Sequence, residues 1–340
     1  MERKQGDYMK TLSKKKSIIS WALIALICIV VFIAPSYMSK YEMNILITIL
    51  STAYLAQCWN LMSGFTGQFS FGHAAFYGLG AYTSSLLYVD FGISPWIGII
   101  MGMLVAGVVA AIIGFLSFYY NLKGDYFALA TLAFAEILRA IFKNTKGLKA
   151  AAGVSITYNK DVSLMQFAGK SGYLYMIFIM LFIITVGIYF LKKTKTGLYF
   201  VAIRENEDAA KALGINGFKY KMMGLIASAM LTALAGTFYA QYYLYIDPTI
   251  VFGSTVSTNA ITPCIIGGVG TVFGPILGAF IIQPISILTN AYLSKFIGLN
   301  MIVYGLILCL VIIIMPNGVL GLGKKVKVKI FAKKNGGAVS

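Results

Sequence analysis

The stretch TKTGLYFVAIRENEDAAKALG, which runs from Thr194 to Gly214, is the one long mixed-charge segment inside an otherwise apolar chain. Of the 340 residues, 59% are hydrophobic and 11% are charged, whereas a soluble domain carries about 25% charged residues. On both sides of this stretch, apolar runs of about 20 residues recur, which is the length needed to cross a bilayer. We therefore expect an all-α polytopic membrane protein. A β-barrel is excluded because the apolar runs are continuous rather than alternating.

The basic residues are distributed as in a membrane protein. A net charge of +17 could indicate nucleic-acid binding. However, the Lys and Arg residues gather in tails and loops that flank the apolar runs, which is the positive-inside pattern. We therefore exclude nucleic acid as a partner and expect a lipid bilayer. Residues 1–17 and 324–340 are predicted basic tails on either side of a membrane domain at residues 18–323.

The apolar runs predict about ten transmembrane or partly broken helices. The first is read as an uncleaved span, because a signal peptide has a shorter apolar core and a small-residue cleavage site. The predicted spans are Ile18–Ala34, Met43–Met62, a third that follows the glycine-rich stretch Ser63–Tyr82 and ends near Tyr88, Trp96–Phe118, Tyr126–Phe142, Tyr173–Leu191, Met222–Tyr245, a discontinuous Pro248–Gly270, Val272–Leu293 and Ile297–Met315.

Counts of Lys and Arg predict the topology. The N-terminal tail holds six, Lys192–Lys221 holds seven and the C-terminal tail holds six, so we place all three in the cytoplasm. Six spans before the Thr194–Gly214 stretch and four after it satisfy this arrangement. The loop Lys143–Gly172 should then face outside, although it holds five lysines and one acid, Asp161. Either an acidic partner docks on this loop or the span count is wrong by one on that side.

The Thr194–Gly214 stretch predicts one short amphipathic helix outside the hydrocarbon. It should begin near Gly197, run for about four turns and end with Gly214 in the left-handed conformation. Glu207 and Lys211 stand in the favourable order at i and i+4. The predicted apolar stripe consists of Leu198, Val201, Ala202, Ala209, Ala212 and Leu213.

Two glycine clusters, in Ser63–Tyr82 and in Gly267–Phe280, indicate close helix packing or breaks in the helices. Transporters contain broken helices in corresponding positions of their two halves, and a break can point backbone amides at a carboxylate. The alternative is helix packing with internally satisfied hydroxyls. Such packing is also the first reading of Gly98-x-x-x-Gly102 and Gly274-x-x-x-Gly278.

Charged and polar groups inside the spans need partners. Glu136 and Arg139 stand at i and i+3, and we expect an ion pair or a wet surface. His73, the one histidine, cannot make a metal site and is predicted to be a packing residue. The candidates for the translocation pathway or the helix breaks are Gly64, Thr66, Gly67, Gln68, Ser70, Gly72, His73, Glu136, Gly267, Gly268 and Gly270.

Four motifs together carry a resemblance to a known family. They are Ser63–Tyr82, LKGDYFALATLAFAEILR at Leu122–Arg139, IRENEDAAKALGIN at Ile203–Asn216, and GGVGTVFGPILGA at Gly267–Ala279. The chain resembles the branched-chain amino-acid permeases of ABC importers, and specifically the longer of their two paired subunits. Asp208-Ala209-Ala210-x-x-x-Gly214 is similar to the Glu-Ala-Ala-x-x-x-Gly core of the cytoplasmic loop in ABC-importer permeases. Asp replaces Glu here.

The resemblance implies a role for the Thr194–Gly214 stretch as a coupling helix that inserts into an ATPase. The implied coupling residues are Gly197, Arg204, Glu205, Glu207, Asp208, Ala209, Ala210, Lys211 and Gly214. It further implies two ABC ATPase subunits, a homologous second permease, an extracytoplasmic substrate-binding protein and a small-molecule substrate as partners. The expected location is the cell membrane of a prokaryote. The chain itself needs no cofactor and no metal, and is not expected to be an enzyme.

The expected function is import of leucine, isoleucine and valine. Departures from the family pattern near Lys149–Ala152 and at Pro263-Cys264 leave another small polar solute open, such as urea or an amide, a nucleoside or a simple sugar. An ion-coupled secondary transporter is a third possibility, but Glu136 is the one clear intramembrane acid. No nucleophile–base spacing supports an enzyme.

Overall fold

The computed structural model describes residues 34–293, together with Ile302, Gly305, Leu306, Cys309, Leu310, Ile313 and residues 318–321. Apart from Ala34, the predicted first span lies outside the described residues. Both basic tails and most of the predicted span Ile297–Met315 lie outside them as well.

Helices dominate the described part of the chain, and its strands form one short pair. In chain order the elements are η1 (Ala34–Ser36), α2 (Lys40–Trp59), η2 (Asn60–Gly64), α3 (His73–Phe91), α4 (Pro95–Tyr119), α5 (Asp125–Asn144), η3 (Lys146–Leu148), η4 (Ala150–Ala152), β1 (Val154–Ser155), η5 (Val162–Leu164), α6 (Lys170–Leu191), α7 (Lys195–Glu205), α8 (Glu207–Ala212), α9 (Gly217–Tyr243), β2 (Tyr245–Ile246), α10 (Pro248–Val251), α11 (Ser254–Gly267) and α12 (Gly274–Leu293).

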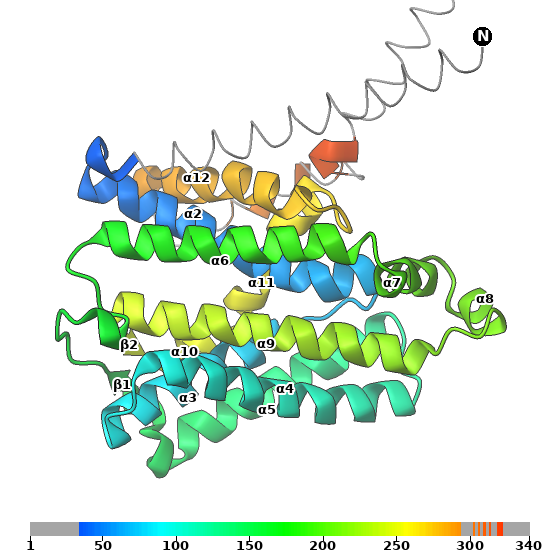
Figure 1. The fold of residues 1–340 in the computed structure, drawn as a ribbon, viewed down its shortest axis with the longest axis horizontal. Coiled ribbons are helices and arrows are strands. Elements are labelled where there is room, and N and C mark those ends of the chain that lie inside the picture. Colours follow the sequence, from blue (N-terminus) through cyan, green and yellow to red (C-terminus); the bar gives the residue numbers. More distant parts are fainter. Residues whose placement is uncertain are drawn as a thin grey trace, which may run out of the picture.

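The predicted fold class, an all-α polytopic membrane protein, is confirmed. Six described helices are long and apolar enough to cross a membrane, and α3 and α5, with 19 and 20 residues, accompany them. The long helices lie side by side, with α7 and α8 at one end of the bundle and the β1–β2 pair at the other (Figure 1). The six are Lys40–Gly64, Pro95–Tyr119, Lys170–Leu191, Gly217–Tyr243, Pro248–Gly267 and Gly274–Tyr292.

Local sequence signals explain where several helices begin and end. At the start of α2, the Ser39 side chain accepts from the backbone of Glu42, and the Glu42 side chain accepts from the backbone of Ser39. This reciprocal capping box satisfies two backbone donors that a helix start leaves free. Pro95 occupies the first position of α4, where its missing N–H costs nothing. Gly92 ends α3 in the left-handed conformation, with φ +66°.

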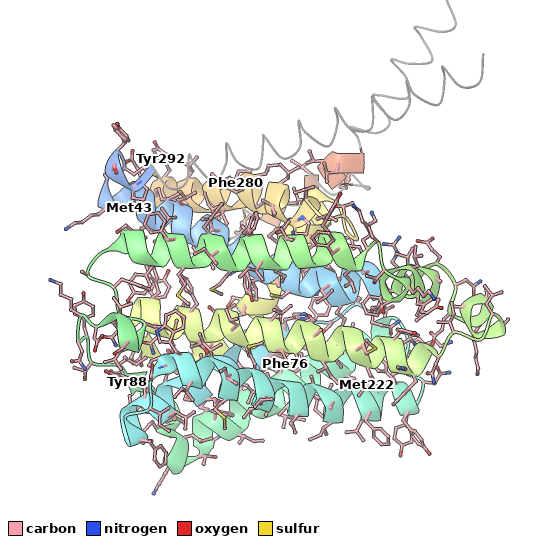
Figure 2. The ribbon with its side chains drawn as sticks, viewed as in Figure 1. Met43, Phe76, Tyr88, Met222, Phe280 and Tyr292 are labelled. Atoms are coloured by element: carbon pink, nitrogen blue, oxygen red, sulfur yellow. The ribbon has the colours of Figure 1, made fainter. Side chains whose placement is uncertain are left out.

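The helices pack as two groups. In one, α2 packs against α6, α11 and α12, and in the other α3 packs against α4 and α9. Each group has its own buried apolar cluster. Apolar side chains also cover the outside of the bundle, and on α12 Phe280 and Tyr292 are exposed (Figure 2). An apolar exterior suits helices surrounded by lipid.

Glycines set the closest approach between α3 and α9. Gly80 of α3 lies against the backbone of Ala233, and Gly236 of α9 lies against the carbonyl of Tyr77. A Cβ atom at either glycine would fall far inside contact distance of those backbone atoms. Gly102 of α4 packs on the same Gly80, where its Cβ would lie 3.2 Å from the Cα atom of Gly80. The predicted packing role of Gly98-x-x-x-Gly102 is thereby confirmed.

The loop Lys143–Gly172 folds into a cap at the end of the bundle opposite α7 and α8 (Figure 1). Its strand β1 pairs antiparallel with β2, which follows α9. The Trp96 indole donates to the carbonyl of Val162 over 3.0 Å, and Lys149 forms a 2.7 Å ion pair with Asp90. Since α6 alone separates this cap from the Thr194–Gly214 stretch, the two lie at opposite ends of one span.

Candidate coupling site and helix breaks

The Thr194–Gly214 stretch forms two helices, α7 and α8, so the prediction of a single four-turn helix was wrong. Asn206 leaves the helical conformation, with φ −160° and ψ 107°. Its side chain accepts a 2.9 Å hydrogen bond from the backbone of Ala209 and starts α8 as an N-cap. Asn favours such caps over helix interiors because its side chain competes for backbone groups. The predicted ending at Gly214, with φ +81°, is confirmed.

The buried face of these helices also differs from the prediction. Gly197, Phe200, Ile203 and Ala210 are buried, whereas the predicted stripe is largely exposed, with Leu213 at 81%. The break at Asn206 turns α8 out of register with α7, so one continuous helical stripe does not exist. Gly197 packs against the end of α6, where a Cβ atom would collide with the carbonyl of Leu191.

Glu207 is directed into the bundle and not along α8. Its carboxylate lies 2.5 Å from the Lys221 ammonium of α9 and 3.6 Å from that of Lys123 in the α4–α5 link. The side chain of Lys221 is only 4% exposed, and its ammonium lies 5.6 Å from the centre of the Phe118 ring. The predicted Glu207–Lys211 pair is therefore replaced by long-range pairs that tie α8 to the membrane helices.

A different set of side chains faces outward from α8. Asp208 is 88% exposed and lies 3.7 Å from Lys123, while Lys211, Ala212 and Leu213 are also exposed. This end of the bundle thus presents a small surface that mixes one acid, one base and one large apolar side chain. We call Asp208, Lys211, Ala212 and Leu213 the α8 outer surface.

The first glycine cluster is a helix break. The π-helical turn η2 ends at Gly64, the chain is non-helical over residues 67–72, and α3 begins at His73. Thr66 and Ser70 are fully buried, and Gln68 is nearly so. Hydroxyl and backbone partners hold this segment: the Thr66 hydroxyl donates to the carbonyl of Met62 over 2.7 Å, and the Trp59 indole donates to the carbonyl of Ser70 over 2.8 Å.

Neighbouring helices hold the last part of this break. The backbone N–H of Phe71 donates to the Thr131 hydroxyl of α5 over 3.1 Å, and its carbonyl accepts a 2.5 Å bond from the Ser257 hydroxyl of α11. A Cβ atom at Gly72 would lie 2.7 Å from the carbonyl oxygen of Thr131. The end of the break therefore lies between α5 and α11.

The second cluster breaks the chain between α11 and α12, and it meets the first. Asn60 holds the second break with two hydrogen bonds: its amide donates to the carbonyl of Thr271 over 2.9 Å, and its oxygen accepts from the backbone of Gly270 over 2.8 Å. Gln57 adds a 2.6 Å bond to the carbonyl of Val272. Gly268 and Gly270 both have positive φ, and Gly267 packs against the backbone of Gly274.

Arg204, at the end of α7, reaches these two breaks. Its Nη1 donates a 2.9 Å hydrogen bond to the carbonyl of Gly64, and Nη2 lies 2.6 Å from the carboxylate of Glu205. The predicted coupling residues thus divide into two sets. Arg204 and Glu207 contact the membrane helices, while Asp208 reaches only Lys123 in the α4–α5 link and, like Lys211, is exposed.

His73 and Glu136 lie apart from this junction. His73 is fully buried, its Nε2 lies 2.9 Å from the Ser228 hydroxyl, and that hydroxyl donates to the carbonyl of Cys58. This is the packing role that the sequence predicted. Glu136 forms a 2.5 Å ion pair with Arg139 on the half-exposed side of α5, as expected. Within the described residues, no group of three His, Cys, Asp or Glu side chains could hold a metal ion.

The sequence alone did not predict the roles of Asn60 and Gln57 in holding the second break, or of Lys221 in binding Glu207. A signal was present, since Gln57 and Asn60 are polar residues at i and i+3 inside a predicted span. Polar groups at that depth require partners. Their partners lie more than 200 residues away in the sequence, so only the fold reveals them.

Broken helices that meet inside a bundle of apolar spans are typical of membrane transporters. Residues 42–312 match the family described as branched-chain amino acid transport system / permease component. The chain belongs to this family, and the resemblance carried by the four motifs is confirmed.

Two relatives in the family are about a quarter identical to this chain over the matched regions. The high-affinity branched-chain amino acid transport system permease protein LivM of Escherichia coli (strain K12) is 27% identical over 77% of this chain and 65% of its own length. The matched region therefore spans less than two thirds of that relative. The high-affinity branched-chain amino acid transport system permease protein LivH of Salmonella typhimurium is 25% identical over 81% of this chain and 93% of its own length.

A third relative is named for the import of a different substrate. The autoinducer 2 import system permease protein LsrC of Enterobacter sp. (strain 638) is 32% identical over 31% of this chain and 32% of its own length.

Proposed function

We propose that this chain is a transmembrane permease subunit of an ATP-driven ABC importer for branched-chain amino acids. It works in the cell membrane of a prokaryote beside a homologous second permease, two ABC ATPases and an extracytoplasmic substrate-binding protein. ATP is hydrolysed in the separate ATPase subunits. The family match over residues 42–312 is the observation that carries this proposal.

The geometry of α7 and α8 supports an ATPase partner. Helix α8 projects from one end of the bundle (Figure 1), and Leu213 of the α8 outer surface is 81% exposed. Glu207 meanwhile anchors α8 to Lys221 and Lys123. A helix that is anchored on one side and exposed on the other can carry a partner's movement into the spans, which then alternate between two arrangements.

The basic cap supports an acidic partner on the opposite side. Of its five lysines, Lys149 pairs with Asp90, whereas Lys143, Lys146 and Lys160 are exposed. Because α6 separates the cap from the coupling segment, an extracytoplasmic position fits a coupling segment that faces the cytoplasm. An acidic surface on the substrate-binding protein is the partner that such charge complementarity selects.

ATP-dependent uptake tests the function. The complex, with both permeases, both ATPases and the binding protein, is reconstituted in liposomes and supplied with radiolabelled leucine. We expect accumulation that requires ATP and is competed by isoleucine and valine. Uptake driven by an ion gradient in the absence of ATP would instead establish a secondary transporter. Binding of a nucleoside, a urea derivative or a sugar by the cognate receptor, with no affinity for leucine, would establish another substrate. The autoinducer 2 relative makes that second outcome worth measuring.

Reversing the charge of Asp208 should weaken ATPase docking. Asp208 is 88% exposed, so Asp208→Lys adds no bulk inside the bundle; it replaces the 3.7 Å pair with Lys123 by two like charges and places a cation on the α8 outer surface. We expect recovery of the ATPase in a pull-down of the permease to fall about tenfold. A group on the ATPase that complements the Asp208 carboxylate would then face a cation, and like-charge contacts at an interface are costly. The control is Asp161→Lys, which makes the same charge change in the cap at the other end. Equal ATPase recovery with both variants would argue against α8 as the docking helix.

A further inference from the structure

The Arg204 side chain occupies a space that two glycines, Gly67 and Gly270, leave open. Its Nη1 donates to the Gly64 carbonyl in the first break over 2.9 Å. A Cβ atom at Gly67 would lie 2.7 Å from the Arg204 Cγ atom, and one at Gly270 would collide with Nη1. Gly67 and Gly270 also have φ values of +75° and +71°, which favour glycine. The backbones of both breaks therefore close around one arginine from α7.

The acceptor that Arg204 selects is the end of a helix. Gly64 is the last residue of η2, where carbonyl groups lack partners in the following turn. A helix C-terminus carries partial negative charge, so a cation there is favourable. The guanidinium also forms a charge-assisted hydrogen bond, which is stronger and more directional than a neutral one. Arg204 thus caps the helix that leads into the first break.

The two breaks behave as one unit at this point. Asn60, within the π-helical turn, bonds to Thr271 and Gly270 in the second break. Any shift of the turn Asn60–Gly64 therefore moves the backbone of Gly270 with it. π-Helical turns are rare in proteins, and those that occur often lie at functional sites. This fits a segment that changes its hydrogen bonds.

We propose that Arg204 is the positioning residue that transmits displacement of α7 and α8 to both helix breaks during transport. When the ATPase moves α8, the guanidinium is withdrawn from the Gly64 carbonyl and from its place beside Gly270, and the two breaks shift together to open the pathway. This inference rests on the proposed function for its ATP-driven step. It gives Arg204 a role inside the membrane protein and not at the ATPase surface.

The first test measures coupling in the complete reconstituted complex. Arg204→Gln keeps a polar side chain but removes the charge and the reach to Gly64. We expect ATPase recovery and basal ATP hydrolysis close to wild type, while leucine transported per ATP falls at least about tenfold, as for loss of a typical coupling free energy. Arg204→Lys, which keeps the charge, should recover part of this ratio. Lys195→Gln removes an exposed cation from the same helix and should leave the ratio unchanged.

The second test measures the contact itself in the purified subunit. Hydrogen exchange should rise in peptides that cover residues 60–72 and 267–273 of Arg204→Gln, with α4 unchanged, because local opening controls exchange. This readout needs neither ATP nor a substrate. Absence of leucine uptake by the wild-type complex would refute the proposed function, while the exchange result would still decide whether Arg204 holds the breaks.

Three outcomes overturn the proposal. They are an unchanged ratio of leucine to ATP in Arg204→Gln, a loss of ATPase recovery in that variant, and unchanged exchange in both breaks. The loss of ATPase recovery would make Arg204 a docking residue. If Arg204→Gln yields no folded subunit, the same measurements are made on Arg204→Lys. We then expect a smaller fall in the ratio of leucine to ATP, and an unchanged ratio would overturn the proposal.

Discussion

Gly236→Ala is expected to prevent or severely weaken packing of α3 on α9. The added methyl group would collide with the Tyr77 carbonyl oxygen and lie 3.0 Å from the backbone nitrogen of Ala81. Both obstacles are backbone atoms, so neither can move aside as a flexible side chain would. Overpacking of this kind costs about 1–3 kcal/mol, and the upper end is expected where two helices must separate. The measurement is the yield of monodisperse protein and its apparent melting temperature in detergent.

The matched control is Gly187→Ala in α6. Apart from its chain neighbours and the backbone of its own helix, no atom lies within 4 Å of a Cβ placed there, and the residue is inside a helix, four residues before its end. Alanine favours helix over glycine by about 0.5–1 kcal/mol, so this variant should be as stable as wild type or slightly more so. The argument from close approach fails if both variants melt at the temperature of the wild-type protein.

Glu207→Gln should destabilise the junction between α8 and the membrane helices. It removes the carboxylate 2.5 Å from Lys221, whose side chain is 4% exposed, and leaves this buried cation with a neutral amide in place of its anionic partner. Breaking a buried pair costs about 3–5 kcal/mol, and we expect the lower end because the Glu207 side chain keeps 24% exposure. The expected observation is a lower apparent melting temperature together with rapid proteolysis between α7 and α9.

Two further variants make this prediction specific. Combining Glu207→Gln with Lys221→Met should restore most of the lost stability, because replacing both ions removes the uncompensated charge. Asp208→Asn removes an acid that is 88% exposed and should change stability by less than about 0.5 kcal/mol. A double variant as unstable as Glu207→Gln alone would show that the ion pair is not the cause.

Coupling studies should separate Glu207 from Asp208. Changing both residues together would confound two effects, since Glu207 anchors α8 on the buried Lys221 while the Asp208 side chain is 88% exposed. Loss of ATPase recovery in Asp208→Lys then reports on docking, and loss of stability in Glu207→Gln reports on anchoring.

Much of the architecture could be predicted because it depends on local physics. Continuous apolar runs placed α4 and α6 within a few residues of their observed ends, since a bilayer admits only helices of about that length. Both helix breaks fall in the glycine clusters, where the sequence indicated either breaks or close packing, and Gly214 ends the Thr194–Gly214 stretch with positive φ as predicted. The predicted ion pair Glu136–Arg139 also formed, because its partners are one turn apart.

Errors arose where a local rule competed with a distant partner. At Glu207 the nearby Lys211 satisfies the i, i+4 rule, yet the buried Lys221 of α9 takes the carboxylate. An exposed helix pair contributes only a few tenths of a kcal/mol, about 0.3–0.5, whereas an unpaired buried ammonium costs several times more. At Asn206 the predicted helix was broken because the residue caps α8.

By itself, the sequence determined that this chain crosses a membrane many times, that two glycine clusters mark close helix packing or helix breaks, and that a charged segment lies outside the hydrocarbon. These features follow from transfer free energies and backbone freedom, which belong to individual residues and short windows. Only the tertiary structure decided that the breaks meet at Asn60 and that Arg204 from the Thr194–Gly214 stretch packs against both of them. Those contacts join residues between about 140 and 211 positions apart, and no local pattern encodes which distant groups a polar side chain will meet.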